Sequence, residues 1–368
     1  MKIQAAVVRA PHAPMSMETL DLEAIRDNEI LVRLVATGVC HTDIAMRDQA
    51  FPVPQPIVLG HEGAGVVEAV GRAVRKVKAG DHVVMSFNSC GHCDSCQEHA
   101  PSYCHDFFGA NFAGQRPDGT SPLSRGAESI HGNFFGQSSF ATYSICTERN
   151  IVKVPQSAPL ELLGPLACGI QTGAGAVINA LQPRMGQSLA VFGSGSVGMA
   201  AIMAARAIGL TTIIAVDLVD ERLALARELG ATHTLNPKAS GDTVAEIKRI
   251  TGAGVHRSFE TTGVMKVLRQ AVESLAPRGT CGFVGASAVG TEVSLDVIDI
   301  MTQGKTLRGI VEGDANPDVF IPALIALHAQ GRFPFDKLIR FYPFERLNEA
   351  IQDSEAGTVV KPVVRMPA

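Results

Sequence analysis

Apolar residues in roughly the first 160 positions occur in short segments, among them EILVRLVATGV, GAGVVEAVG and DHVVMSF. Glycine, proline and aspartate separate these segments, which is typical of short strands joined by turns. The first part of the chain is therefore predicted to be an irregular, β-rich domain.

From about residue 165 the pattern changes to strands and helices in alternation. QSLAVFGSGSVGMAAIMAARAIG predicts an apolar strand, a glycine turn and an alanine-rich helix. TTIIAVD predicts the next buried strand, and LVDERLALARELG predicts a helix that ends at Gly230. SFETTG, VLRQAVESLAPRG and TCGFVGAS continue the alternation. Apolar strands that alternate with helices predict a doubly wound parallel sheet, the Rossmann type of α/β fold.

After about residue 310 the chain carries a predicted helix, PDVFIPALIALHAQG, and a terminal segment, GTVVKPVVRM. A chain of 368 residues is too long for one core of ordinary size. We therefore expect two domains. Residues 1–168 and 311–368 form the β-rich domain, and residues 169–310 form the Rossmann domain.

Composition and charge limit the classes of partner. Hydrophobic residues make up 46% and charged residues 18% of the chain, and the formal net charge is −4. No basic excess is available to neutralise phosphates, so a nucleic acid or an anionic membrane is not expected as a partner. The start, MKIQAAVVRAPHAP, lacks the apolar region of a signal peptide, and no run of 18 apolar residues occurs. We expect a cytoplasmic protein.

Half of the eight cysteines lie in SCGHCDSCQEHAPSYC, at Cys90, Cys93, Cys96 and Cys104. In a reducing compartment such a cluster favours metal binding over disulfides. The two-residue gaps let successive thiolates converge on one ion, and four sulfurs complete a tetrahedron. We predict a closed structural zinc site in loop 90–104 that performs no chemistry. The alternatives are a redox-active cysteine pair and free thiols.

A glycine-rich motif follows the first strand of the predicted parallel sheet. GSGSVG places Gly193, Gly195 and Gly198 in the GxGxxG pattern, with Val197 inside it, and Asp217 ends the next strand. A strand before the motif, a helix after it and a later carboxylate are the context of a dinucleotide site. The glycines let the backbone approach a pyrophosphate, and the carboxylate accepts hydrogen bonds from ribose hydroxyls.

The cofactor expected at this motif is NAD, because the carboxylate of Asp217 repels a 2′-phosphate. Arg222 is a nearby cation that can bind such a phosphate, and it therefore favours NADP. A nicotinamide cofactor implies hydride transfer. A Rossmann fold with a vestigial site is the alternative.

Three further residues are candidate metal ligands. GVCHTD, GHEGAG and GPLACGIQTG place Cys40, His61 and Cys168 in glycine-bounded loops. Two cysteines and one histidine can hold a zinc ion whose fourth position is free for a substrate. Spacing alone does not establish such a site, because a single cysteine at the end of a strand is more often a small core residue.

The chain resembles the zinc-dependent medium-chain alcohol dehydrogenases along essentially its whole length. GHEGAGVVEAVGRAV carries the family's signature at Gly60, His61, Glu62, Gly65, Gly71 and Val74, and the four-cysteine loop, GxGxxG and PFERLNEAI keep the family's order. The resemblance implies a GroES-like catalytic domain and an NAD-binding Rossmann domain, with NAD and two zinc ions per subunit.

By this resemblance Cys40, His61 and Cys168 bind the catalytic zinc, which is the ligand set established for alcohol dehydrogenases. Glu62 is the carboxylate that can approach the metal during ligand exchange. Asp43 is expected to accept a hydrogen bond from the ring of His61 and so to fix its orientation. Zinc lowers the pKa of a bound alcohol, which can then transfer hydride to the nicotinamide.

Thr42 resembles the family's hydroxyl that hydrogen-bonds the alcohol and passes its proton towards the nicotinamide ribose. Many members end this relay with a histidine where this chain has Ala45, so we expect water or another residue to complete it. His41 stands where a basic residue often contacts the pyrophosphate. Thr172 is expected near the nicotinamide, and Lys361 is a candidate phosphate contact.

Phe51, Phe87, Phe134 and Phe135 lie in segments that line the substrate cleft in relatives. Aromatic walls suit a flat, conjugated alcohol, although each ring can equally be an ordinary core residue. FFGQSSFATY, LLGPLACGIQTGAGAVINAL and VEGDANPDVFIPALI resemble the bacterial aryl-alcohol (benzyl alcohol) branch, which also contains geraniol dehydrogenases. We expect reversible oxidation of primary benzyl-type alcohols to aldehydes, with geraniol and other allylic terpenoid alcohols as the alternative.

Three other classes of function are alternatives to an alcohol dehydrogenase. A glutathione-dependent formaldehyde dehydrogenase shares the scaffold, and its activity would require added glutathione. A zinc-free quinone reductase lacks the cysteines, and a non-enzymatic NAD and zinc sensor would bind the cofactor without turnover. Segment 107–134 is long, as in dimeric relatives. We therefore expect a homodimer joined through Rossmann sheet edges, with a homotetramer as the alternative.

The substitution Ala45→His tests the proposed relay. It is expected to change the pH dependence of turnover, because an imidazole titrates near neutral pH and would enter the proton path. The measurement is the turnover number as a function of pH. An unchanged pH profile would count against this account of the relay.

Overall fold

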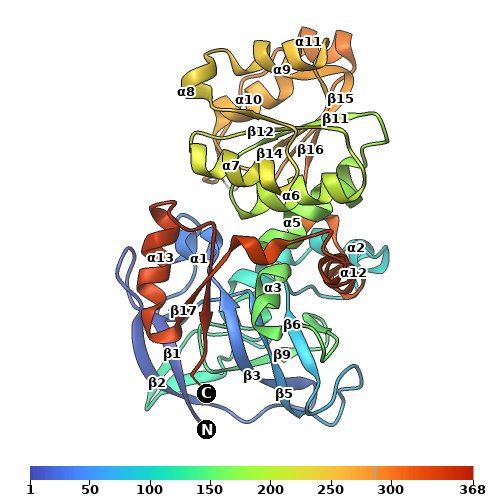
Figure 1. Cartoon of the computed structure of the whole chain (residues 1–368). Coiled ribbons are helices and arrows are strands. Elements are labelled where there is room, and N and C mark those ends of the chain that lie inside the picture. Colours follow the sequence, from blue (N-terminus) through green and yellow to red (C-terminus); the bar gives the residue numbers. More distant parts are fainter. Residues whose placement is uncertain (286, 368) are drawn as a thin grey trace. The chain divides into compact units, whose positions relative to one another are not determined.

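The computed structural model describes residues 1–285 and 287–367. These residues form two compact units (Figure 1). Unit 1 holds Met1–Cys168, Asn316–Ile325 and residues 336–367, and unit 2 holds Gly169–Ala315 and Ala326–Phe335. The chain passes to unit 2 after Cys168, where the sequence places the domain boundary. The point at which the chain returns to unit 1 differs from the expected residue 311. Residues 311–315 and Ala326–Phe335 belong to unit 2 and not to the β-rich unit.

Unit 1 contains two sheets. The five-stranded sheet has the order β4-β1-β2-β7-β8, with β1 (Lys2–Val8), β2 (Ser16–Leu22), β4 (Ile57–Val58), β7 (Leu123–Arg125) and β8 (Glu128–Ile130). The seven-stranded sheet has the order β10-β6-β5-β3-β18-β17, and β9 also pairs with β3. Its strands are β3 (Glu29–Gly38), β5 (Gly63–Val70), β6 (His82–Met85), β9 (Tyr143–Thr147), β10 (Ile151–Lys153), β17 (Ile339–Pro343) and β18 (Lys361–Arg365).

Strand β18 brings the C-terminal part of the chain into the seven-stranded sheet, between β3 and β17. It runs antiparallel to β3, with Val363 opposite Gly38 and Val364 opposite Thr37. Because the two strands are antiparallel, the start of β18 lies beside the end of β3. Lys361, the first residue of β18, is therefore close to the segment that follows β3 and contains Cys40.

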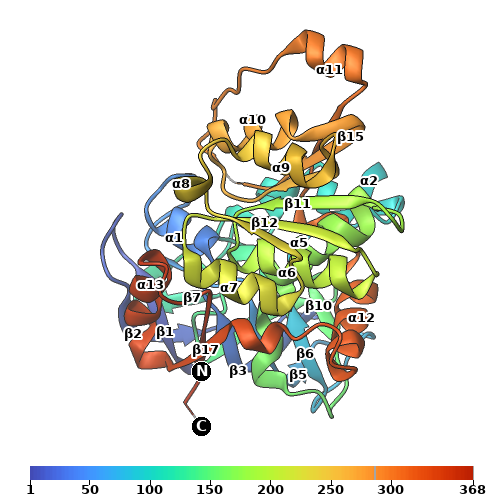
Figure 2. The ribbon, with the colours of Figure 1, turned by 45° about the horizontal axis from the view of Figure 1, so that its top comes forward.

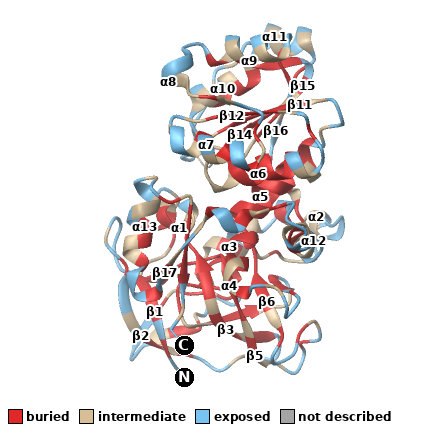
Figure 3. Ribbon diagram, viewed as in Figure 1, coloured by how far each residue is buried: buried red, intermediate tan, exposed pale blue. Residues whose placement is uncertain are grey.

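Short helices connect the strands of unit 1. The α-helices are α1 (His41–Arg47), α2 (Asp94–Gln97), α3 (Phe107–Phe112), α4 (Leu160–Leu163) and α13 (Leu347–Glu355), and α12 (Pro317–Ala329) crosses the boundary between the units. The 3₁₀ turns are η1 (Pro101–Tyr103), η2 (Phe134–Gly136), η3 (Gly164–Ala167), η6 (Phe335–Leu338) and η7 (Phe344–Arg346). The strands and turns at the centre of unit 1 are buried (Figure 3).

Unit 2 is the Rossmann fold that the alternating pattern predicts. Its six strands are all parallel in the order β13-β12-β11-β14-β15-β16. They are β11 (Ser188–Phe192), β12 (Thr212–Val216), β13 (His233–Leu235), β14 (Val255–Glu260), β15 (Leu275–Phe283) and β16 (Thr306–Gly309). Every residue of β11 is buried, as expected for a strand covered on both faces.

Helices cover both faces of the parallel sheet, with α6 and α7 on one side and α9 and α10 on the other (Figure 2). The helices of unit 2 are α5 (Gly169–Gly175), the π-helical η4 (Ala176–Leu181), α6 (Ser196–Ala207), α7 (Asp220–Leu229), α8 (Pro237–Ser240), α9 (Thr243–Thr251), α10 (Met265–Glu273), α11 (Val297–Gln303) and η5 (Glu312–Asp314). No single helix of the described chain is long and apolar enough to cross a membrane. The bent helix pair Leu160–Ala167 and Gly169–Leu181 is together long and apolar enough, by length and composition only.

Candidate active site

Unit 1 brings together the three predicted catalytic-zinc ligands. Cys40 precedes α1, His61 precedes β5, and Cys168 follows η3. Together with Glu62 they place one potential ligand atom each within 4.8 Å of one another. The sulfur atoms of Cys40 and Cys168 are 4.0 Å apart. Residues far apart in the sequence thus form one cluster, in which Cys40 is half-buried and the other three residues are buried.

The imidazole of His61 is oriented by Asp43. Nδ1 of His61 lies 2.8 Å from Oδ1 of Asp43, and both side chains are fully buried. The same carboxylate accepts hydrogen bonds from the backbone amides of Cys40 and Gly60, each at 3.1 Å. Asp43 thus lies where the sequence analysis expects it, and its role beside a metal stays a prediction. One buried carboxylate fixes the start of α1 and the histidine ring together.

The opposite ring nitrogen of His61 is available to bind a metal ion. Nε2 is buried and has no hydrogen-bond partner among the described residues. Buried polar atoms are rarely left without a partner. Two thiol groups share the cluster with this nitrogen, and nitrogen with sulfur is the donor set that zinc prefers. The residues present therefore fit a zinc ion with three protein ligands.

The electrostatics of the cluster suit a metal as well. A hydrogen bond with Cys168 holds the pKa of the Cys40 thiol well below its ordinary value, against the opposing effect of burial. Thiolates are the form in which cysteine binds zinc. Burial raises the pKa of Glu62 to about 7, although the charge of Lys361 acts in the opposite direction.

Glu62 forms a buried ion pair with Lys361. Nζ of Lys361 donates to both carboxylate oxygens of Glu62 at 2.8 Å and to the carbonyl of Val39 at 3.2 Å. A Cβ on Gly38 would lie 1.9 Å from Oε2 of Glu62, so only glycine fits there. The sequence did not indicate this pairing, and the contact of Lys361 with a phosphate stays a prediction.

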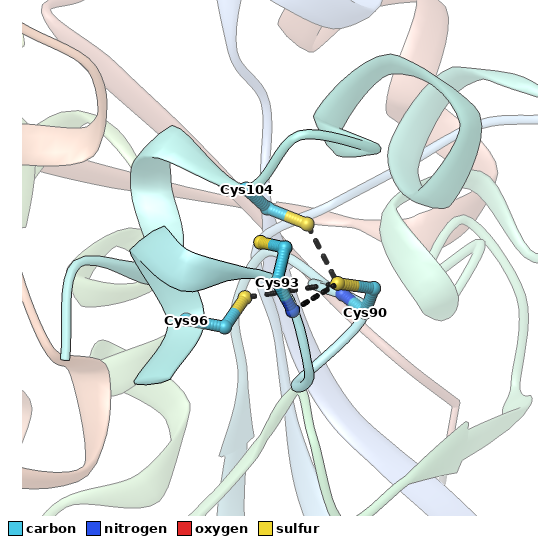
Figure 4. A group of neighbouring side chains, drawn as sticks. All are labelled: Cys90, Cys93, Cys96 and Cys104. Atoms are coloured by element: carbon cyan, nitrogen blue, oxygen red, sulfur yellow. Dashed lines mark hydrogen bonds between the residues drawn. The ribbon is translucent and has the colours of Figure 1, made fainter. Parts of the chain in front are cut away.

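The second cluster contains Cys90, Cys93, Cys96 and Cys104, whose sulfurs gather at one point (Figure 4). The four sulfur atoms lie within 4.8 Å of one another. Backbone amides point at them, with Cys90 N 3.2 Å from the sulfur of Cys104 and Cys93 N 3.4 Å from that of Cys90. None of the eight cysteines, all of which lie in the described part of the chain, is in a disulfide. The arrangement fits a closed four-thiolate zinc site.

The glycine motif in unit 2 has the backbone that a dinucleotide site needs. Gly193 directly follows β11 and has a φ of +95°, which favours glycine. A Cβ on Gly198 would lie 1.8 Å from the carbonyl oxygen of Gly193, so glycine is also required there. Asp217 follows β12, and its carboxylate accepts hydrogen bonds from the amides of Ser194 at 2.6 Å and Val219 at 2.9 Å.

Comparisons with known proteins agree with both units. Residues 26–156 match the alcohol dehydrogenase GroES-like domain, and residues 196–329 match the zinc-binding dehydrogenase domain. The chain is 49% identical to geraniol dehydrogenase of Castellaniella defragrans, over 98% of this chain and 97% of that protein. This chain belongs to the zinc-dependent medium-chain alcohol dehydrogenases.

Two solved structures resemble the dehydrogenase over the whole of both chains. An alcohol dehydrogenase zinc-binding domain protein from Burkholderia ambifaria is 56% identical, with a TM-score of 0.98. Benzyl alcohol dehydrogenase from Acinetobacter calcoaceticus is 46% identical, with a TM-score of 0.97. The predicted combination of a GroES-like domain and a Rossmann domain is therefore confirmed.

Helix α1 of the dehydrogenase carries the residues predicted for the proton relay. Oγ1 of Thr42 lies 3.7 Å from the sulfur of Cys40, so its hydroxyl is beside the zinc-binding cluster. Ala45 is half-buried on the same helix, and His41 is exposed at its first position. Their roles with substrate and cofactor stay predictions.

In unit 2, Thr172 lies on α5, and its hydroxyl is 3.4 Å from the carboxylate of Glu312. Glu312 is a buried acid that the sequence analysis did not identify. Val197 lies in the first turn of α6, inside the glycine motif, and Arg222 is half-buried on α7. The contacts of these residues with a cofactor stay predictions.

The four predicted pocket phenylalanines differ in their exposure. Phe51 is half-buried, whereas Phe87, Phe134 and Phe135 are buried in the core of unit 1. Phe134 and Phe135 pack on the ring of His61, with centroid distances of 5.8 and 4.6 Å. These two rings therefore support the predicted zinc ligand His61, and the contact of any of the four with substrate stays a prediction.

The buried pair yields a stability prediction. Lys361→Met leaves the Glu62 carboxylate buried without a cation, and we expect the free energy of unfolding to fall by about 3–5 kcal/mol. Urea unfolding of the zinc-loaded dehydrogenase measures this change. The control is the double variant Lys361→Met with Glu62→Gln, which lacks both charges of the pair and should recover most of the loss. An equal loss of unfolding free energy in the single and double variants would contradict a stabilising ion pair between Lys361 and Glu62.

Proposed function

We propose that this alcohol dehydrogenase uses NAD and two zinc ions per subunit to interconvert primary benzyl-type alcohols and their aldehydes. The observation that carries the proposal is the buried set of Cys40, His61 and Cys168, which supplies three zinc ligands. Tetrahedral zinc has a fourth position, which an alcohol oxygen can occupy. The relationship to benzyl alcohol dehydrogenase supports the aromatic substrate class.

The residues of the chain prepare the reaction around this site. A zinc ion bound here would supply the Lewis acidity that lowers the pKa of an alcohol hydroxyl. Asp43 holds the ring of His61 so that Nε2 faces the thiol groups. Thr42, beside Cys40, accepts a hydrogen bond from the alcohol and donates its own proton onwards. Because position 45 is alanine, water completes the transfer to solvent.

The choice of NAD rests on Asp217. Its carboxylate is held at the end of β12 by two backbone amides, so it cannot turn away from the glycine loop without losing both hydrogen bonds. A fixed negative charge beside the adenosine ribose favours two hydroxyl groups and disfavours a 2′-phosphate.

Geraniol-type alcohols are the second candidate. Identity to geraniol dehydrogenase is 49% and to benzyl alcohol dehydrogenase 46%, so similarity does not separate the two substrates. In both classes of alcohol an sp² carbon is bonded to the carbinol carbon, and it conjugates with the carbonyl group that is formed. The site can therefore serve either class with one mechanism.

The substrate experiment compares kcat/KM for benzyl alcohol, cinnamyl alcohol, geraniol and ethanol, with NAD and zinc-replete protein. We expect benzyl and cinnamyl alcohols to be preferred over ethanol by at least about 10-fold, which corresponds to roughly 1.4 kcal/mol of transition-state binding. A preference for geraniol would indicate that terpenoid alcohols are the substrate class of the dehydrogenase. No turnover of any of the four alcohols would contradict the substrate assignment.

We also propose that the dehydrogenase is a homodimer joined at the outer strand of the Rossmann sheet. Strand β16 is the last strand of the sheet order, and most of its residues are exposed. The neighbouring α11 exposes Val297, Ile298 and Met301, at 72, 63 and 67% of their surface. Exposed strand edges and apolar patches are usually covered by a partner, and a second copy can extend the sheet across a two-fold axis.

The substitution Ile298→Glu tests this interface. A carboxylate in the apolar patch is expected to convert the dimer to monomers, as measured by light scattering after size-exclusion chromatography. Met185→Glu is the matched control, because Met185 is 93% exposed in the same unit but lies outside α11 and β16. A variant that keeps the wild-type mass would contradict the proposed interface, and a wild-type mass of four chains would favour the homotetramer.

A further inference from the structure

Residues 133–138, which we name the His61 strap, have an unusual backbone. Asn133, Phe135 and Ser138 have φ angles of +63°, +52° and +54°, and Gly136 between them has +67°. Residues with a Cβ rarely adopt positive φ, because the side chain then crowds the backbone. Several such residues in one segment persist only where the surroundings hold them, and they are frequent at functional sites.

Gln137 ties the strap to the backbone of His61 and of the neighbouring strands β5 and β6. Its side-chain amide donates to the carbonyl oxygens of His61 and Met85, both at 3.0 Å. Its side-chain oxygen accepts a hydrogen bond from the amide of Gly63 at 3.1 Å. Gln137 is 2% exposed, so these bonds form away from water.

Two further buried side chains hold the positive-φ conformation. The hydroxyl of Ser138 donates to the carbonyl of Val58 at 2.6 Å and accepts from the amide of Phe134 at 2.9 Å. The side-chain amide of Asn150 donates to the carbonyls of Gly136 at 3.0 Å and Phe135 at 3.3 Å. The strap is thus fixed by hydrogen bonds that would be costly to leave unmade.

The conformation of the strap places two aromatic rings on His61. The ring of Phe135 is tilted by 32° to the imidazole at a centroid distance of 4.6 Å, and Phe134 meets it edge-on at 5.8 Å. Asp43 holds only one ring nitrogen. One hydrogen bond fixes a direction but leaves the imidazole free to rotate about it, whereas a packed ring face also fixes the plane.

We propose that Phe135 is a positioning residue for the zinc ligand His61, and that the strap adopts its strained backbone to set this ring against the imidazole. The inference rests on the proposed function, because it takes the cluster of Cys40, His61 and Cys168 as a zinc site. Phe135 fixes the plane in which Nε2 of His61 approaches the metal. Its effect is on metal retention, independent of which alcohol is oxidised.

The test is the variant Phe135→Leu, which keeps an apolar side chain but removes the flat ring. Zinc-loaded protein is mixed with a chelator, and the number and rate of zinc ions released are measured. We expect one zinc per subunit to leave roughly 10- to 100-fold faster than in wild type, the range found when groups that orient metal ligands are removed. Release from the four-cysteine cluster should be unchanged.

Phe112→Leu is the matched control. Phe112 contacts Phe134 and Phe135 at 5.9 and 5.1 Å, but no ring contact joins it to His61 among the described residues. It is expected to release zinc at the wild-type rate. Cobalt substitution gives a second readout, because the visible absorption of the ion at the three-ligand site should shift in Phe135→Leu and not in Phe112→Leu. If Phe135→Leu does not fold, Phe135→Met fills the same space with a flexible chain and carries the same expectation.

Wild-type rates and spectra in the Phe135 variants would overturn the inference, and so would equal changes in Phe112→Leu, which would indicate general packing. Neither of these two outcomes would contradict the proposed function. A wild-type protein that binds zinc only at the four-cysteine cluster would overturn the proposed function and the inference together. Failure to oxidise the tested alcohols would overturn the substrate assignment alone.

Discussion

The buried carboxylate of Asp43 is the interaction on which the active site depends. It accepts hydrogen bonds from the His61 ring and from the amides of Cys40 and Gly60, so it joins the start of α1 to the segment that enters β5. A charge away from water is tolerated only when it is well hydrogen-bonded. The same bonds that satisfy Asp43 therefore fix two of the three predicted zinc ligands, and the hydroxyl of Thr42 is placed by the helix that begins there.

Around this carboxylate the fold adds contacts from distant parts of the chain. Strand β18 delivers Lys361 to Glu62, and the absence of a side chain at Gly38 makes room for that pair. The His61 strap approaches with Phe134, Phe135 and Gln137. His61 is thereby held through its ring nitrogen, its ring and its backbone, while the glycine loop and Asp217 are organised separately within unit 2.

The two metal sites differ in how far the sequence predicts them. The four-cysteine loop is local, since its ligands lie between residues 90 and 104, and their spacing alone limits the geometry to one compact cluster. The catalytic set comes from residues 40, 61 and 168. Spacing alone left those cysteines open as core residues, and the family resemblance was needed to assign them.

By itself the sequence determined the alternating α/β order, the glycine turn and the carboxylate after β12, because these depend on local periodicity and on backbone conformations that glycine permits. Only the tertiary structure decided that Lys361 pairs with Glu62, that Phe134 and Phe135 are buried against His61, and that Ala326–Phe335 joins unit 2. The first two outcomes follow from the register of β18 against β3 and from positive φ angles in the strap. Pairing between strands more than 300 residues apart has no local signature, and a phenylalanine gives no indication that it will adopt a left-handed conformation.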